Sequence, residues 1–134
     1  MLGIIARSAQ RDVLGFAHEK LFEPLGMKSV IWETAADGLP FGAFGIDMTP
    51  RDMARFGYLY LNHGMWNGQQ IIPAWYVAVT PPRSKASRAY GYLFWNFPQF
   101  PFNFGSSFEA NGAGGQFIVI LPAVDLVIVR TASG

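Results

Sequence analysis

The first part of the chain places apolar residues at helical spacing. Residues 2–10 have the character of a helix, and a second helix is expected over residues 12–22 with Asp12 as its N-cap. Its apolar face consists of Val13, Phe16, Ala17 and Leu21. Pro24 and Gly26 follow and are suited to ending it. Residues 38–46 show no clear period and are expected to form an ordered loop.

A third helix has the strongest start signal in the sequence. Thr49 can accept a hydrogen bond from an early backbone N–H, Pro50 suits the first helical position, and Asp52 favours the positive end of a helix. The apolar stripe that follows consists of Met53, Phe56, Gly57, Tyr60 and Leu61. The sequence at residues 62–64 predicts its end.

Shorter elements connect this helix to the second half of the chain. Asn67-Gly68 is typical of a hairpin turn, and Pro73 is expected to open a short helix that runs to Val79. A polar loop is expected over residues 81–89, and an aromatic-rich excursion over residues 98–105.

The second half of the chain is rich in residues that favour strands. Residues 90–95 predict one strand, and residues 116–121 and 126–131 predict two more. Because only residues 122–125 separate the last two, they should form an antiparallel hairpin. Both are nearly continuous in apolar residues, which favours burial on both faces.

A glycine-rich segment interrupts this β-forming region. Residues 111–115 read Asn-Gly-Ala-Gly-Gly between two strand-like runs. Glycine within a strand pattern marks either a bulge or a place where another molecule approaches the backbone closely. In the second case the backbone N–H of Gln116 is a candidate donor to the oxyanion of acyl transfer, beside a substrate-binding segment of Ala113, Gly114 and Gly115.

These elements predict an α+β protein with an antiparallel sheet and packed helices. We expect residues 1–134 to be part of one domain, mainly helical and loop-like over about 1–89 and built of antiparallel strands over about 90–134. Apolar residues make up 51% of the chain and charged residues 14%, well below the usual quarter. We therefore expect part of the surface to be buried against polypeptide outside this chain.

Charge and composition exclude several function classes. The net charge of +1 with scattered basic residues argues against nucleic acid or an anionic membrane surface. The absence of cysteine rules out disulfides and thiolate metal sites, and leaves the cellular compartment undetermined. Pro122 and Asp125 interrupt the longest apolar run, so no membrane span is expected. No cofactor is indicated.

The residues of a complete catalytic centre are missing. No serine lies in Gly-x-Ser-x-Gly, and none has a lysine three positions later. Tyr60-Leu61-Asn62 fits a Tyr-x-Asn pattern, but its place on an apolar helix stripe favours a structural role. His18 and His63 are too few for a metal site, so none is predicted. Asp52 is better explained by capping, and Asp47 by a loop, than as an acid/base pair.

Several blocks, in this order, resemble the β-lactamase-related serine hydrolases. This family includes class C β-lactamases, esterases of the same fold, D-aminopeptidases and 6-aminohexanoate-dimer hydrolases. The blocks are residues 21–27 (Leu-Phe-Glu-Pro-Leu-Gly-Met), 49–57, 59–66, 90–92, 112–116 and the hairpin at 122–129. The esterase and 6-aminohexanoate-dimer hydrolase branch is the most similar.

The resemblance implies part of a β-lactamase/transpeptidase-like fold and an acyl-enzyme mechanism. The family's Ser-x-x-Lys and Tyr-x-Asn or Tyr-x-Ser motifs would lie upstream of Met1, so the missing N-terminal half of the domain is an implied partner. The third motif, Lys-Thr-Gly or His-x-Gly in many members, aligns with residues 113–115. Ala113 replaces the basic residue there, which favours small esters, uncharged amides or linear oligomers over β-lactams.

Two functions remain open at this point. The chain is either the C-terminal portion of a serine hydrolase acting on small esters or amides, inactive without its N-terminal half, or a non-catalytic binding or interaction domain that has kept the sheet. Neither requires a cofactor. An in-frame Ser-x-x-Lys upstream of Met1 would favour the first.

Overall fold

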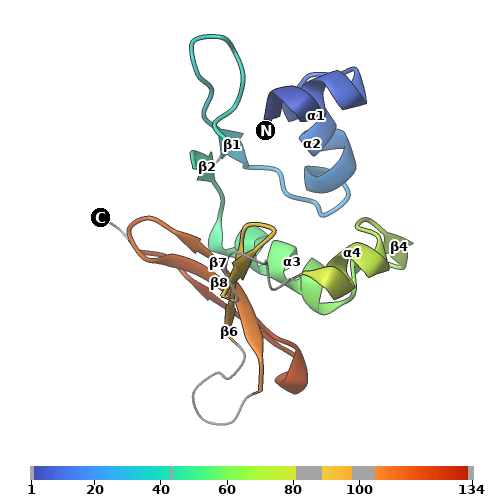
Figure 1. The fold of residues 1–134 in the computed structure, drawn as a ribbon, viewed down its shortest axis with the longest axis vertical. Helices are drawn as coiled ribbons and strands as arrows, with labels where there is room; N and C mark the ends of the chain where they lie inside the picture. Colours follow the sequence, from blue (N-terminus) through green and yellow to red (C-terminus); the bar gives the residue numbers. More distant parts are fainter. Residues whose placement is uncertain (1, 43, 81–88, 98–104, 133–134) are drawn as a thin grey trace. The chain divides into compact units, whose positions relative to one another are not determined.

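The computed structural model describes residues 2–42, 44–80, 89–97 and 105–132 (Figure 1). The predicted polar loop and aromatic-rich excursion lie, except for Ala89 and Gly105, outside these residues. The chain forms two compact units, Met1–Asp52 and Met53–Gly134. Each unit is described separately.

The first unit begins with helical segments. They are α1 (Leu2–Ala9), α2 (Val13–Ala17) and η1 (His18–Phe22). The side chain of Asp12 accepts a hydrogen bond from the Gly15 N–H at 2.7 Å, which confirms the predicted N-cap. The predicted second helix continues through η1, but there the turns widen to a π-helix, as the 2.9 Å bond from Glu23 N–H to the carbonyl of His18 shows.

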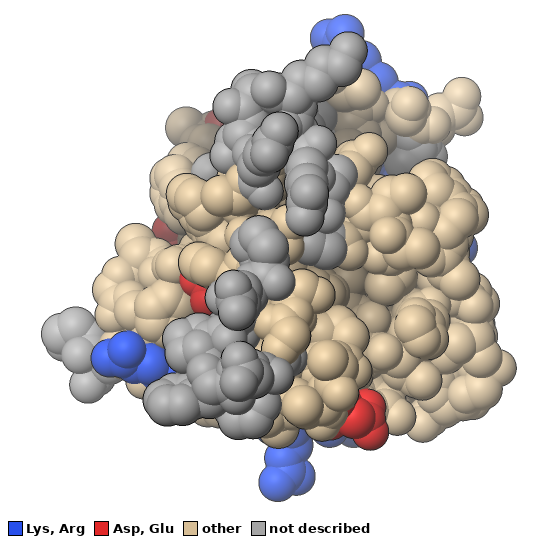
Figure 2. Space-filling view, turned by 60° about the horizontal axis from the view of Figure 1, so that its bottom comes forward, with Lys and Arg blue, Asp and Glu red and all other residues tan. Residues whose placement is uncertain are grey.

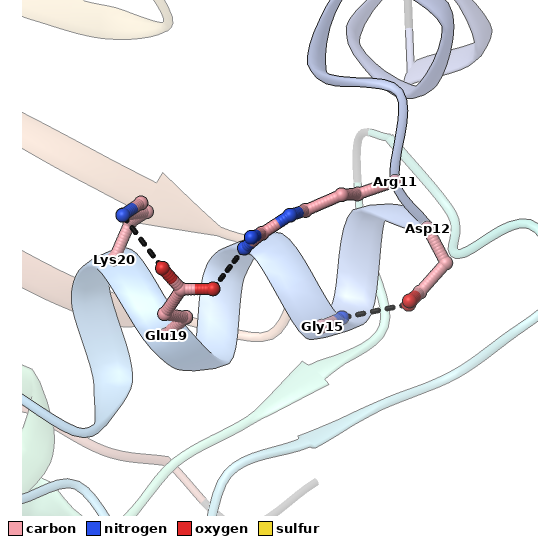
Figure 3. A network of polar contacts seen from close by, with 5 residues as sticks. All are labelled: Arg11, Asp12, Gly15, Glu19 and Lys20. Carbon is pink, nitrogen blue, oxygen red and sulfur yellow. Dashed lines mark hydrogen bonds and ion pairs between the residues drawn. The ribbon is translucent and has the colours of Figure 1, made fainter.

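An exposed ion-pair network lies along α2 and η1. The carboxylate of Glu19 contacts the guanidinium of Arg11 and, at 2.6 Å, the ammonium of Lys20 (Figure 3). The hydrogen bonds from Lys20 and Arg11 hold the pKa of Glu19 below its ordinary value. Because all three side chains are exposed, the network ties the start of α2 to η1 without adding much stability.

The rest of the first unit is a small hairpin. Strands β1 (Ile31–Trp32) and β2 (Ile46–Asp47) pair antiparallel, with Ile31 opposite Asp47. The indole N–H of Trp32 donates to the Phe41 carbonyl at 2.8 Å. The predicted loop over residues 38–46 therefore forms most of the connection between two short strands.

Helix α3 (Pro50–Leu61) begins as the sequence predicts. The Thr49 hydroxyl oxygen accepts from the Asp52 N–H at 3.1 Å, and the hydroxyl donates to the Asp52 carboxylate at 2.8 Å. At the C-terminal end of the helix, the Gly64 N–H donates a hydrogen bond to the Leu59 carbonyl at 2.7 Å, and Gly64 has a φ of +82°. Capping at both ends fixes where this helix starts and stops.

Two short elements follow α3. Strands β3 (Met65–Trp66) and β4 (Gln69–Gln70) form a hairpin whose turn is Asn67-Gly68, with φ of 47° and 78°. Positive φ at both central positions is the requirement of a type I′ turn, so this prediction is confirmed. Helix α4 (Ala74–Val79) then begins after Pro73, also as predicted.

A five-stranded antiparallel sheet forms the rest of the second unit (Figure 1). Its strands, in spatial and sequence order, are β5 (Tyr90–Gly91), β6 (Phe94–Phe97), β7 (Ser107–Gly112), β8 (Gln116–Leu121) and β9 (Leu126–Arg130). The predicted hairpin of the last two strands is confirmed, with the 3-10 turn η3 (Pro122–Val124) between them. The single strand predicted over residues 90–95 is wrong, because Tyr92 and Leu93 both adopt positive φ and turn the chain into β6.

One face of the sheet packs against α3. A Cβ on Gly57 would lie 2.6 Å from Cγ1 of Val127 and 2.8 Å from Cγ2 of Ile118, so only glycine permits this close approach. Near this contact, the ring centroids of Tyr60 and Phe94 lie 4.9 Å apart. The neighbouring rings in this cluster are Phe56 and Phe108. The core of the second unit lies here.

The opposite face of the sheet is less covered. The register aligns Trp95, Glu109, Val119 and Ile128 across it, and Trp95 and Ile128 are 42% and 40% exposed. Phe97 and Leu126 on the same face are also exposed. The prediction that β9 is buried on both faces is therefore wrong: its burial alternates because helix α3 covers only one side.

Candidate functional site

The glycine-rich segment forms the turn between β7 and β8. The Gly115 N–H donates to the Gly112 carbonyl at 3.3 Å, and Gly114 lies at φ +86°. A β-turn of type II requires positive φ at its third residue, which glycine adopts without steric cost. Gly115 also has positive φ, at +92°. The predicted order of strand, glycines and strand is confirmed, and the glycines connect two strands rather than bulging within one.

Gln116 is the first residue of β8 and lies at a corner of the sheet. It pairs with Gly112 on β7, whereas the pairing of β8 with β9 begins one residue later, at Phe117 and Arg130. Its side chain turns back beneath the turn: a Cβ on Gly114 would lie 3.3 Å from Oε1 of Gln116. That oxygen is buried without a hydrogen-bond partner. Any side chain at residue 114 would press on it.

The predicted substrate-binding residues are thus brought together. Ala113 and Gly114 are exposed, and Gly115 and Gln116 are half-buried. Since three of the four residues from 112 to 115 are glycine, little side-chain volume screens the backbone from an approaching molecule. This is an open backbone segment at the start of a well-paired strand.

A cation that the sequence analysis did not single out lies beside this turn. A Cβ on Gly115 would be 3.9 Å from Nη2 and 4.0 Å from Cζ of Arg130. The Arg130 guanidinium also lies over the Phe117 ring, 5.7 Å from its centroid. Arg130 is far from the glycines in the sequence and comes close only because β8 and β9 pair. The register of the predicted hairpin was the one signal that could have revealed it.

A cavity of about 210 Å³ lies at the other end of the β7–β8 hairpin. Its lining residues are Tyr60, Leu61, His63, Val77, Ala78, Thr80, Asn96, Ser106, Ser107, Phe108 and Pro122. Ser107 is 1% exposed, and its hydroxyl has no hydrogen-bond partner. Burial, with a smaller effect of Tyr76, raises the pKa of Tyr60 well above the ordinary tyrosine value. None of the residues 113–116 lines this cavity.

The residues set aside as structural have structural roles. Tyr60 is buried among aromatic rings, and the side-chain amide of Asn62 donates to the Met65 carbonyl at 3.0 Å, which closes the end of α3. His18 packs edge-on against Phe22. Asp52 takes part in the cap of α3, because its N–H donates to the Thr49 hydroxyl oxygen and its carboxylate accepts from that hydroxyl. The prediction that Asp47 lies in a loop is wrong: it lies, exposed, in strand β2, paired with Ile31. Across the described part of the chain, no three His, Asp or Glu side chains gather as a metal site would require.

Charged side chains are sparse on the face of the molecule seen in Figure 2. On the face seen in Figure 2, Lys and Arg side chains lie singly, and the surface between them is mostly uncharged. No helix within the described residues is long and apolar enough to cross a membrane.

The solved structures that are similar to this chain include one that matches nearly all of it. It is the "Putative 6-aminohexanoate-dimer hydrolase from Bacillus anthracis", with a TM-score of 0.81 and 28% sequence identity over 96% of this chain. This chain spans 34% of that protein's length. No protein-family model matches the sequence, and no curated protein matches it either. The predicted class, an α+β protein with part of a β-lactamase-like fold, is confirmed by this similarity and by the antiparallel sheet.

Proposed function

We propose that this chain is the C-terminal, substrate-facing part of a serine hydrolase that cleaves small esters or amides through an acyl-enzyme. In this proposal, the attacking serine and its base belong to polypeptide upstream of Met1 in the same domain. The similarity to about a third of a protein named as a hydrolase supports this division. The chain alone would then be inactive.

The observation that carries the proposal is the position of Gln116. Its backbone N–H lies where an exposed glycine turn meets a strand, and its residue precedes the first β8–β9 pair. Hydrogen-bond donors held rigidly where negative charge develops are among the strongest contributions to acyl transfer. We assign the Gln116 N–H the role of oxyanion donor, and residues 113–115 that of the wall along which the acyl group lies.

The substrate class follows from the composition of the turn. Ala113 occupies the position at which many β-lactamase-related hydrolases have a lysine or histidine, and it supplies no charge. The similar solved protein is named for a linear amide, the 6-aminohexanoate dimer. Small esters, amides and linear oligomers therefore fit this turn better than a β-lactam.

The test uses this chain and a longer form that includes the upstream reading frame. We expect an in-frame Ser-x-x-Lys followed by Tyr-x-Asn or Tyr-x-Ser, serine labelling by a fluorophosphonate probe in the longer form, and hydrolysis of p-nitrophenyl acetate only there. Stoichiometric labelling of residues 1–134 alone would contradict the proposal. So would a longer form that has both motifs, folds cooperatively and yet takes up no label.

The partly exposed face of the sheet opposite α3 favours a second candidate, a non-catalytic interaction domain. Trp95, Phe97, Leu126 and Ile128 present large apolar side chains on that face. Exposed apolar patches of this kind are typical of surfaces that bind another polypeptide. Unrelated sequence upstream of Met1, together with a chain that is monomeric and melts cooperatively by itself, would favour this candidate over the hydrolase.

A further inference from the structure

The cavity at the far end of the β7–β8 hairpin has no part in the proposed function. Its lining comes mainly from α3, α4, β6 and β7, all within the second unit, and none of residues 113–116 belongs to it. His63, Ala78 and Ser106 line it and are exposed, so the cavity opens to the surface. A dry apolar cavity of about 150 Å³ holds benzene. At about 210 Å³, this cavity can hold a six-membered ring with a small substituent.

The walls of the cavity favour an uncharged guest. Leu61, Val77 and Phe108 contribute apolar side chains, and the rings of Phe108 and Tyr60 lie edge to face at 6.3 Å. Burial raises the pKa of Tyr60 well above the ordinary tyrosine value, so its hydroxyl remains neutral. None of the described lining residues is Lys, Arg, Asp or Glu. A charged guest would therefore lose its hydration without gaining an ionic partner.

Asn96 brings a buried amide to this lining. It is paired with Phe108 in the β6–β7 register, so its side chain leaves the sheet on the face of the Phe108 ring, and the residue is 8% exposed. Its backbone N–H donates to the Ala89 carbonyl at 2.6 Å, but no hydrogen bond within the described residues involves its side-chain amide. The hydroxyl of Thr80, by contrast, donates to the Tyr76 carbonyl at 2.9 Å. Because buried polar side chains are nearly always hydrogen-bonded, the Asn96 amide indicates a place for an external partner.

We propose that this cavity binds a small neutral carboxamide with a cyclic apolar body, held by the side-chain amide of Asn96. A carboxamide can accept from Nδ2 of Asn96 and donate to Oδ1 at the same time, whereas a hydroxyl group satisfies only one of the two at once. The apolar body of the guest packs against Leu61, Val77 and Phe108. Since the cavity lies apart from the glycine turn, this inference does not rest on the proposed function.

The test uses three probes that share one ring. Benzamide is neutral and polar, benzoate has nearly the same shape but is charged, and toluene is apolar. In a ¹H–¹⁵N NMR titration of residues 1–134, we expect benzamide to shift the side-chain amide of Asn96 and the backbone amides of Val77 and Phe108 saturably. Benzoate at the same concentration should shift them little. Nuclear Overhauser effects between the benzamide ring and the Val77 methyl groups should place the guest in the cavity without any substitution.

Asn96→Leu tests the role of the amide. It removes both hydrogen-bonding groups and keeps a side chain of similar size, so benzamide affinity should fall about tenfold while toluene affinity stays equal or rises. This reversal of preference cannot result from loss of the fold, which would weaken both probes. Gln69→Leu is the control, because it removes an exposed amide in β4 that does not line the cavity. It should leave the affinity for both probes unchanged.

Several results would overturn the proposal. They are equal binding of benzamide and benzoate, unchanged benzamide affinity in Asn96→Leu, and no saturable shift at all, which would show that the cavity holds only water.

The same titration in the longer form separates this inference from the proposed function. Benzamide should bind there as well, and its loss would show that upstream polypeptide fills the cavity, which also overturns the proposal. Shifts confined to residues 114–116 would place the amide at the glycine turn, against the cavity site but in favour of the hydrolase. If benzamide shifts Asn96 while the longer form hydrolyses no ester, the cavity site stands and the hydrolase falls.

Discussion

The two ends of the β7–β8 hairpin differ in burial and in side-chain size. At one end, which we call the core end, Phe108 is paired with Ile120, and these two residues and their neighbours Ser107 and Leu121 are all at least 94% buried. At the other, the turn end, Gly112, Ala113 and Gly114 are exposed and carry almost no side chain. The same two strands thus connect a packed core to an open backbone.

The contrast shows how a packed sheet can hold an exposed backbone segment, the glycine turn, in a defined position. Glycines reduce stability wherever they occur in strands, because they pack nothing and gain much entropy on unfolding. In the β7–β8 hairpin this loss of stability is confined to residues 112–115, which follow four paired positions of the ladder, Phe108 to Asn111. Substitutions at the core end should therefore change stability, and those at the turn end should change binding or catalysis.

The largest effect on stability is expected from Ile120→Ala at the core end. Ile120 is 0% exposed, and truncating a buried isoleucine costs about 2–5 kcal/mol through lost burial and the cavity left behind. Chemical denaturation followed by tryptophan fluorescence measures the change. Val124→Ala, at an exposed position in the η3 turn between β8 and β9, is the control and should cost little. A loss below 1 kcal/mol for Ile120→Ala would show that the core end is not packed as described.

Gly57→Ala should give the next largest loss. The added Cβ meets Val127 and Ile118 at distances that carbon atoms do not adopt, so α3 must move away from the sheet. Overpacking of this kind costs about 1–3 kcal/mol. Gly3→Ala is the control, since a Cβ on that helical glycine meets nothing. Equal or greater stability for Gly57→Ala in a thermal melt would contradict the close packing of α3 on the sheet.

A smaller effect on stability is expected from Gly114→Ala at the turn end. An L-residue at φ +86° is strained by about 1–2 kcal/mol, and the new Cβ would also press on the Gln116 side chain. The hydrolysis of p-nitrophenyl acetate by the longer form should be affected more than stability, because the turn that positions residues 115 and 116 is distorted. If Gly114→Ala leaves both unchanged, the glycine is not required for this turn.

The pH dependence of the core end is expected to appear only in alkali. The pKa of Tyr60 is raised on folding, so its neutral hydroxyl favours the folded state fully below the ordinary tyrosine pKa of about 10. That contribution is lost as pH rises from there toward the raised value. Between pH 9 and 11, wild-type protein should lose more stability than Tyr60→Phe in urea titrations. Parallel losses would show that Tyr60 ionises as freely when folded as when unfolded.

Local signals in the sequence predicted most of the elements. The caps at Asp12 and Thr49, the Asn67-Gly68 turn and the hairpin after Gln116 each depend on a few neighbouring residues, and each formed as predicted. The prediction over residues 90–95 failed for a different reason. Tyr92 and Leu93 adopt positive φ, which neither residue favours, so the turn is specified by the pairing of β5 with β6 in the sheet and not by a local signal.

The non-local features were not predicted, although the register of the predicted β8–β9 hairpin was a signal for one of them, the position of Arg130. The approach of Arg130 to Gly115 depends on the β8–β9 register, and the one-sided burial of β9 depends on α3 covering a single face. The cavity beside Ser107 is assembled from residues on α3, α4, β6 and β7. Each of these features joins segments that are distant in the sequence, for which composition and periodicity carry no signal.

The most direct measurement compares Gln116→Pro with Gln116→Ala in the longer form. Proline removes the backbone N–H and is tolerated at the first residue of a strand, whereas alanine keeps the N–H and removes only the side chain. If the amide stabilises the oxyanion, Gln116→Pro should lower kcat for p-nitrophenyl acetate by about 10²–10³-fold, while Gln116→Ala changes it little. Equal kcat in the two variants, with both folded, would contradict the role assigned to this amide.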